Sequence, residues 1–191
     1  MKKKTLISIL LLIFISLTIN AQTDSINNRG TVYDNYITQK GFKIKFVDKK
    51  LSKISYGISS NTYLKCKLRI VEVEGIEKQY FVILGDDDDN IIEYSDLINV
   101  NKELERLIKE VDIDISQNPD YIENKYISND GFVIGYYIEG KKSKWFMQLY
   151  YRPFKLIPYK GYGNQEIYKI EKFSEGLKNI IKEIEEIIQK Q

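Results

Sequence analysis

The sequence predicts an α+β fold, in which an antiparallel sheet of about six to eight strands carries two amphipathic helices on one face. Several short runs alternate apolar and polar residues with a period of two, as half-buried strands do. Two longer segments repeat apolar residues at spacings of three and four, which is typical of helices. Each helical segment follows a group of strand segments, and this order places both helices in one layer.

Residues 1–21 have the layout of a secretory signal peptide. Lysines at positions 2–4 precede an apolar run over 5–19, and Ala21, the only alanine in the chain, provides the small side chain that a signal peptidase needs before its cut. The apolar run is shorter than the roughly 20 residues that span a bilayer. We therefore expect export, cleavage near Ala21-Gln22, and no stable membrane anchor afterwards.

The rest of the chain divides into two parts. Residues 22–39 are polar without a sustained period, which predicts a flexible N-terminal segment. Residues 40–191 hold all the strand and helix patterns and predict a single α+β domain. Without residues 1–21 the chain has 26 basic and 27 acidic side chains. Such a balance gives no long-range attraction to nucleic acid, so we expect no nucleic-acid binding.

Missing residue types exclude much of enzyme chemistry. The chain has no histidine, so neither a Ser-His-Asp nor a Cys-His arrangement can form. Glycine-rich cofactor fingerprints are missing as well. Cys66 is the only cysteine, and its place in an apolar phase predicts a buried thiol. We expect no catalytic residue, no metal and no cofactor, which favours a protein that is not an enzyme.

The first half of the domain predicts five strands. They cover 42–46, 54–58, 64–70, 80–84 and 91–94. Phe42, Ile44 and Phe46 alternate with lysines and should share one buried face. From Val71 onward the apolar phase is reversed, which indicates a β-bulge near Ile70.

A helix follows, and the second half repeats the order. Ser95 and Asp96 open this helix as its cap and first-turn acid, and its apolar stripe reaches Val111. Further strands are predicted over 121–127, 132–139, 144–151 and 166–170, and a closing helix starts at Ser174.

The two halves resemble each other in the character of their residues. Residues 79–84 align with 144–149, and 91–108 align with 167–184. This order is what a strand-strand-strand-helix duplication would produce.

An acidic run over 86–89 is the first candidate site. Asp86, Asp88 and Asn90 offer hard oxygen ligands that suit Ca²⁺ outside the cell. The spacing does not fit an EF-hand, because Leu97 stands where the bidentate glutamate would be needed. We favour the alternative of a solvated turn whose charges block extension of the sheet.

Two rows of basic residues form a second candidate. Lys43 and Lys45 lie in one strand segment, and Lys65, Lys67 and Arg69 lie in another. On neighbouring strands they would make a basic patch for an acidic polysaccharide or partner. We favour the simpler interpretation, the solvated face of an antiparallel sheet.

The densest aromatic segment is the preferred candidate for partner binding. Its residues are Tyr150, Tyr151, Arg152, Phe154, Tyr159 and Tyr162. Exposed aromatic side chains beside an arginine are typical of surfaces that bind proteins or sugars. Prolines and glycines over 152–164 indicate a long connection, and such loops often carry function.

Two stretches carry a resemblance to known proteins. One is Ile92-Glu93-Tyr94-Ser95-Asp96-Leu97, and the other runs from Tyr126 to Gly135 and includes Asp130-Gly131-Phe132. A strand, a helix and a "DGF-x-x-G" hairpin ahead of a final amphipathic helix resemble small uncharacterised bacterial proteins. The resemblance covers roughly the second half of the chain and implies no catalytic residue. Scarce alanine beside abundant Ile, Lys and Asn also suits an AT-rich bacterial genome.

The sequence thus favours an exported bacterial protein, periplasmic or secreted, that acts as a non-catalytic binding domain. Its expected partner is a protein or glycan in the cell envelope or outside the cell. The alternative is a Ca²⁺- or glycan-dependent module or enzyme that uses the acidic run over 86–89.

Overall fold

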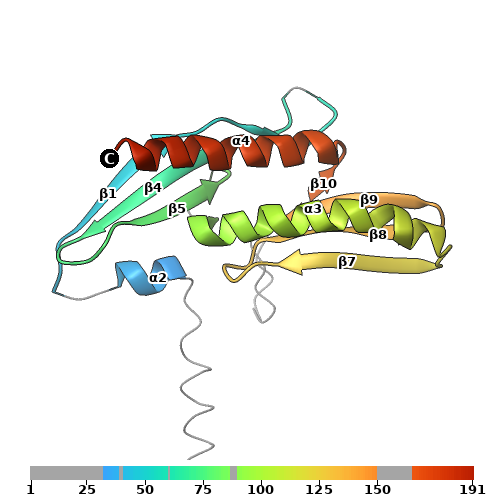
Figure 1. The fold of residues 1–191 in the computed structure, drawn as a ribbon, viewed down its shortest axis with the longest axis horizontal. Coiled ribbons are helices and arrows are strands. Elements are labelled where there is room, and N and C mark those ends of the chain that lie inside the picture. The colour runs from blue at the N-terminus through green and yellow to red at the C-terminus, as the bar shows by residue number, and fades with distance from the viewer. Residues whose placement is uncertain (1–31, 39–40, 60, 87–89, 150–164) are drawn as a thin grey trace, which may run out of the picture.

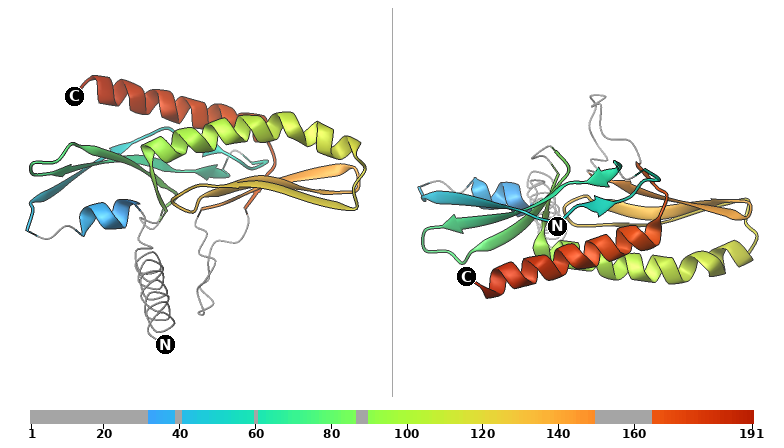
Figure 2. Two further views of the ribbon diagram at one scale, coloured as in Figure 1. Left: turned by 60° about the horizontal axis from the view of Figure 1, so that its bottom comes forward. Right: turned by 90° about the horizontal axis from the view of Figure 1, so that it is seen from above.

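The structure is a computed structural model that describes residues 32–38, 41–59, 61–86, 90–149 and 165–191. It has the predicted α+β fold with antiparallel strands. The described strands form two four-stranded sheets and one two-stranded sheet, in place of one larger sheet. Two long helices cover both large sheets from the same side (Figures 1 and 2). The predicted signal peptide lies outside the described residues.

The first sheet has the order β1-β4-β5-β6. Its strands are β1 (Ile44–Lys50), β4 (Cys66–Val73), β5 (Gln79–Leu84) and β6 (Ile91–Glu93). Between β1 and β4 the chain forms a hairpin of β2 (Ile54–Ser55) and β3 (Tyr63–Leu64). Helix α3 (Tyr94–Ser116) follows β6 directly, one residue before the predicted start.

The second sheet repeats this arrangement with the order β10-β9-β8-β7. Its strands are β7 (Tyr121–Ile127), β8 (Val133–Glu139), β9 (Lys142–Gln148) and β10 (Gln165–Ile167). Helix α4 (Ile170–Gln189) completes the chain and starts one turn before the predicted Ser174.

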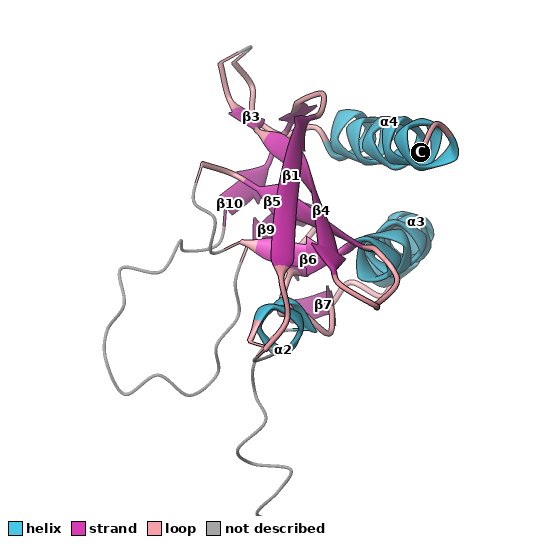
Figure 3. Ribbon diagram, turned by 90° about the vertical axis from the view of Figure 1, so that its left-hand side faces the viewer, coloured by secondary structure: helices cyan, strands magenta, loops and turns pink. Residues whose placement is uncertain are grey.

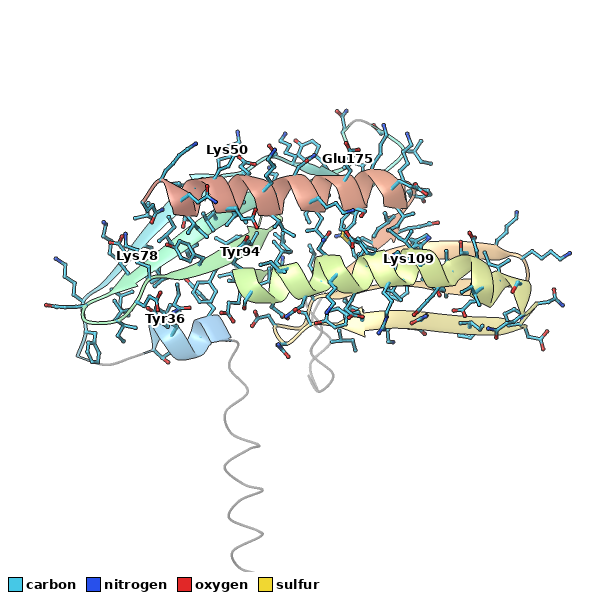
Figure 4. The ribbon with its side chains drawn as sticks, in the orientation of Figure 1. Tyr36, Lys50, Lys78, Tyr94, Lys109 and Glu175 are labelled. Atoms are coloured by element: carbon cyan, nitrogen blue, oxygen red, sulfur yellow. The ribbon has the colours of Figure 1, made fainter. Side chains whose placement is uncertain are left out.

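Each of the two long helices packs against elements of the other half of the chain. α3 follows the first sheet but also packs on β7, β8 and β9 of the second. α4 follows the second sheet, runs back beside the first and contacts α3 and β2 (Figures 1 and 3). Tyr94, the first residue of α3, lies between the two helices (Figure 4). One buried core therefore joins both sheets, both helices and the hairpin.

The aligned halves occupy equivalent places. Leu97 and Leu104 of α3, and Phe173 and Ile180 of α4, are each at most 1% exposed and belong to the shared core. Each half is an antiparallel meander in chain order that ends in a helix. Each half contributes one four-stranded sheet, whereas the duplication inferred from the sequence has three strands per unit.

A short helix, α2 (Val32–Ile37), packs on the second face of the first sheet. The rings of Tyr33 and Phe81 meet edge to face at 5.0 Å, and the Tyr36 hydroxyl donates a hydrogen bond to the carbonyl of Glu77 at 2.8 Å. Figure 4 shows Tyr36 between α2 and this sheet. Residues 32–37, which belong to the predicted N-terminal segment over 22–39, form this helix.

This cover explains why two details of the sequence analysis are wrong. β4 keeps an unbroken register with β1 and β5, so there is no bulge near Ile70. The apolar phase changes at Val71 because β4 is buried on both faces, with α2 over the second. The shared buried face expected for Phe42, Ile44 and Phe46 is also wrong. β1 is an edge strand that α2 covers only in part, so Phe46 in β1 and Phe42 just before it stay 47% and 51% exposed.

Candidate functional site

The predicted aromatic segment lies outside the described residues, but the strands on either side of it are described. Its members Tyr150, Tyr151, Arg152, Phe154, Tyr159 and Tyr162 all fall in 150–164. The flanking strands β9 and β10 are paired, with Met147 opposite Gln165. The described residues before and after the segment therefore lie side by side at the β10 edge of the second sheet.

The β2–β3 hairpin is attached to that same edge. The backbone N–H of Tyr168, just after β10, donates a hydrogen bond to the carbonyl of Tyr56 at 2.9 Å. Ile54 is fully buried in the shared core and packs against Gly176 of α4. The backbone N–H groups of Tyr56 and Gly57 both donate hydrogen bonds to the carbonyl of Thr62 and close the hairpin loop.

This hairpin presents apolar and aromatic side chains to solvent. Ile58, in the loop, is 71% exposed, and Tyr168 is 54% exposed. The Lys53 ammonium lies 3.6 Å above the centre of the Tyr63 ring, and this contact lowers the pKa of Tyr63. We call Lys53, Ile58, Tyr63 and Tyr168 the hairpin surface.

Chemically, the hairpin surface suits binding. Exposed aliphatic and aromatic groups beside a cation are the features that protein interfaces use. Sequence reasoning missed this surface because it assigned 54–58 to a regular strand. The available signal was Ile58, an apolar residue between Gly57 and two serines.

The acidic run is only partly described, since 87–89, and with them Asp88, lie outside the described residues. The Asp86 carboxylate forms an ion pair with the Lys65 ammonium across the end of β4. Asn90 is 4% exposed, and its carbonyl accepts a hydrogen bond from Leu84 N–H at 2.9 Å. Both described candidates thus have structural contacts of their own.

The basic rows lie on neighbouring strands, because β1 pairs with β4, but the register puts them on opposite faces of the sheet. Lys45 stands opposite Glu72 on one face, whereas Arg69 stands opposite Asp48 on the other. Acids neutralise several of them. Lys45 Nζ lies 3.0 Å from the Glu72 carboxylate, and Arg69 forms a two-pronged contact with Asp48 at 2.8 and 2.7 Å. This pairing lowers the pKa of Asp48. The two rows therefore make neither one basic patch nor one solvated face, and Arg69 also donates a hydrogen bond to Tyr33 of α2.

Two buried carboxylates, Asp96 and Asp130, bind backbone groups. Asp96 is 2% exposed and accepts a hydrogen bond from Asp130 N–H at 3.1 Å. Asp130 is 6% exposed and accepts one from Glu93 N–H at 2.7 Å. The DGF hairpin therefore caps the start of α3, which is a structural role. Ser95 was predicted to cap this helix, but the capping side chain is Asp130, from the other half of the chain.

A second polar cluster connects α3 to the second sheet. The fully buried Tyr136 donates a hydrogen bond to the Asp114 carboxylate at 2.6 Å and accepts one from the Asn124 amide at 3.1 Å. The same amide donates to the Glu110 carboxylate at 3.2 Å. Burial, together with Asp114, raises the pKa of Tyr136. These groups anchor the helix on the sheet.

Cys66 is 2% exposed, which confirms the predicted buried thiol. Burial raises its pKa to about 12. Thiolates are the reactive form of cysteine, so this thiol is chemically quiet at neutral pH.

Surveys of the described residues find no group of three or more His, Cys, Asp and Glu side chains that could hold a metal ion. The helices in this part of the chain are too short or too polar to cross a membrane. Comparisons of the chain with protein-family models, curated proteins and solved structures found no match.

Proposed function

We propose that this chain is a non-catalytic binding domain that acts after export, in the cell envelope or outside the cell. Its partner is a protein, and its binding face is the hairpin surface together with the aromatic segment over 150–162. The observation that carries this proposal is the exposure of Ile58, in the hairpin, and of Tyr168, whose backbone is hydrogen-bonded to the hairpin.

Anchoring matters because a rigid binding surface loses little entropy when a partner docks. Ile54 is buried against α4, and a side chain at Gly57 would clash with Thr62. The exposed Ile58 therefore follows directly on residues that are packed against the rest of the fold. An apolar side chain that is 71% exposed contributes little to folding, so its removal tests binding separately from stability.

The test is affinity capture with tagged protein on envelope and culture-medium fractions of the source cell. A stoichiometric partner should be lost from Ile58→Ser, from Tyr168→Ser, and from the double variant Tyr151→Ala, Phe154→Ala. Ile113→Ser is the matched control, because Ile113 is 60% exposed on α3. Capture that survives all three changes, or is lost only together with the melting transition, would contradict the proposal.

The calcium alternative has its own test. Binding at the acidic run over 86–89 requires Asp86 to exchange Lys65 for the ion. It predicts that millimolar Ca²⁺ raises the melting temperature and that a chelator reverses the rise. A flat response removes this alternative.

A further inference from the structure

β7 is an edge strand with a regular backbone. It closes one end of the second sheet, with β8 on one side and no second strand neighbour among the described residues (Figure 1). All seven of its residues pair with β8 in an unbroken register, and none is proline. Bulges, prolines, very short strands and charged side chains are the usual devices that stop an edge from pairing with another chain. Of these β7 has only the charges, Glu123 and Lys125, which are of opposite sign.

The sequence of β7 is complementary to itself. It reads Tyr-Ile-Glu-Asn-Lys-Tyr-Ile over Tyr121–Ile127. When two copies run antiparallel with Asn124 opposite Asn124, Glu123 lies opposite Lys125 twice, once on each side of the centre. The outer positions pair aromatic with β-branched side chains: Tyr121 with Ile127, and Tyr126 with Ile122. Such opposite-charge and aromatic pairs are the ones that stabilise neighbouring strands.

We propose that two copies of this chain associate through β7, antiparallel and centred on Asn124. The two second sheets then form one continuous eight-stranded sheet. The interface is isologous, which is the commonest kind in homo-oligomers. A two-fold axis between antiparallel neighbours stands perpendicular to the sheet, so both α3 helices lie on the same face of the dimer.

The charges select this register over its neighbours. Two-fold symmetry allows only registers in which some residue lies opposite its own copy. Centring on Glu123 would set two glutamates against each other, and centring on Lys125 would set two lysines against each other. Each of these registers also leaves residues at one end of β7 without a partner in the other copy. The register at Asn124 pairs the whole strand with no like charges opposite.

β1 provides a contrast within the same molecule. It is the edge strand of the first sheet and occupies the place that β7 has in the second. Its central residue is Val47. Self-pairing about that centre would set Lys45 against Lys49 twice, which is repulsive. Self-complementarity is therefore a property of β7 and not of the repeated architecture.

Side-chain contacts in the protomer fit the dimer. Lys125 Nζ lies 2.7 Å from the Glu123 carboxylate, so the seam is already neutral before association. Tyr121 and Ile127, at the two ends of β7, are 56% and 42% exposed. The dimer places each of them beside the other from the second copy. On the other face, Asn124 is held by Glu110 and Tyr136, so the centre of the seam is ordered.

Charge exchange tests the register directly. Glu123→Lys alone sets four lysines at the seam, and Lys125→Glu alone sets four glutamates. Each should weaken the dimer about tenfold or more. The double variant Glu123→Lys, Lys125→Glu restores every pair, and an equimolar mixture of the two single variants should form a heterodimer. Sedimentation equilibrium measures the association of the two single variants, the double variant and the mixture, each prepared in the form that the source cells release. Circular dichroism confirms that each protein is folded.

Disulfide trapping gives a second readout. Asn124→Cys places two thiols directly opposite, at a Cα separation of about 4.5–5.5 Å, within reach of a disulfide. Lys125→Cys is the matched control, because its two copies are diagonal neighbours about 7–8 Å apart. A wild-type protein that stays monomeric at the highest concentration reached overturns the proposal. So does a dimer that ignores the single charge changes, a double variant that stays monomeric, or cross-linking at 125 in preference to 124.

The inference is independent of the hairpin surface. Loss of partner capture in Ile58→Ser with an intact dimer, or the reverse in Glu123→Lys, separates the two proposals.

Discussion

Asp96 binds the backbone of Asp130 across the boundary between the two halves, and Asp130 in turn binds the backbone just ahead of α3. Asp96 Oδ2 accepts the N–H of Asp130 at 3.1 Å, and Asp130 Oδ2 accepts the N–H of Glu93, at the start of α3, at 2.7 Å. Both side chains are almost fully buried. A carboxylate at a helix N-terminus satisfies an otherwise unpaired donor and complements the helix dipole. The first helix of the domain is thus capped by a turn of the second sheet.

This relationship predicts coupled losses of stability. Asp130→Ala and Asp96→Ala should each lower the free energy of unfolding by about 1–2 kcal/mol, the usual cost of a lost cap. The double variant should lose less than the sum, because either change alone loosens the shared turn. Urea denaturation of the four proteins measures the coupling. Asp112→Ala, at an exposed position of α3, is the control; strictly additive losses would contradict the cooperative cap.

Removing the hydroxyl of Tyr136 should destabilise the protein more than removing the hydroxyl of Tyr137. Tyr136→Phe removes a hydrogen bond to Asp114 and one from Asn124, and should cost about 1–2 kcal/mol of unfolding free energy. Tyr137→Phe removes the same atom one residue later, on the opposite face of β8, and should cost clearly less. Thermal unfolding of both variants makes the comparison. Equal losses would show that the buried network does not anchor α3.

Cys66 predicts a pH dependence at the alkaline end. The native thiol has a pKa of about 12, against an ordinary value of 9.0. Above about pH 9 the thiol ionises in the unfolded chain but stays protonated in the native protein. The free energy of unfolding should therefore fall as pH rises from about 9 towards 12, by up to about 1.4 kcal/mol per pH unit from this group.

The comparison that isolates this effect is wild type against Cys66→Ala. Alanine does not titrate, so the stability advantage of the wild type over the variant should shrink between pH 8 and pH 10.5. Urea denaturation at several pH values measures it. A constant difference would mean that the native thiol ionises as readily as the unfolded one.

Gly176 should be needed for the hairpin to dock on α4. A Cβ at this position would lie 3.0 Å from Ile54 Cγ2, so Gly176→Val should overpack the contact and cost about 1–3 kcal/mol. Glu175→Val, which adds the same side chain at an exposed neighbour, is the control. Combining Gly176→Val with Ile54→Ala should cost less than the two changes summed. Thermal unfolding decides, and a neutral Gly176→Val would show that the hairpin moves aside freely.

Sequence patterns located most elements because each pattern reports on one segment's own faces. The strand predicted over 121–127 matches β7 at both bounds, and the apolar run over 80–84 predicted β5 to within a residue. The spacing of three and four along 97–111 predicted a helix whose Leu97 and Leu104 are fully buried. The burial of Cys66 was predicted in the same way, from its place in the apolar phase of its strand.

What the sequence alone determined was therefore the α+β class, the two long helices with most of the strands, and many of the residues that these turn to the core. Tertiary structure decided the rest: the division into two sheets, α2 over the second face of β4, the hairpin beside α4, and Asp130 as the cap of α3. The physical reason is that periodicity arises from a segment's own burial, whereas these features depend on which distant segment supplies the cover. Nothing in the local sequence of α3 encodes that its cap comes from a turn 37 residues later.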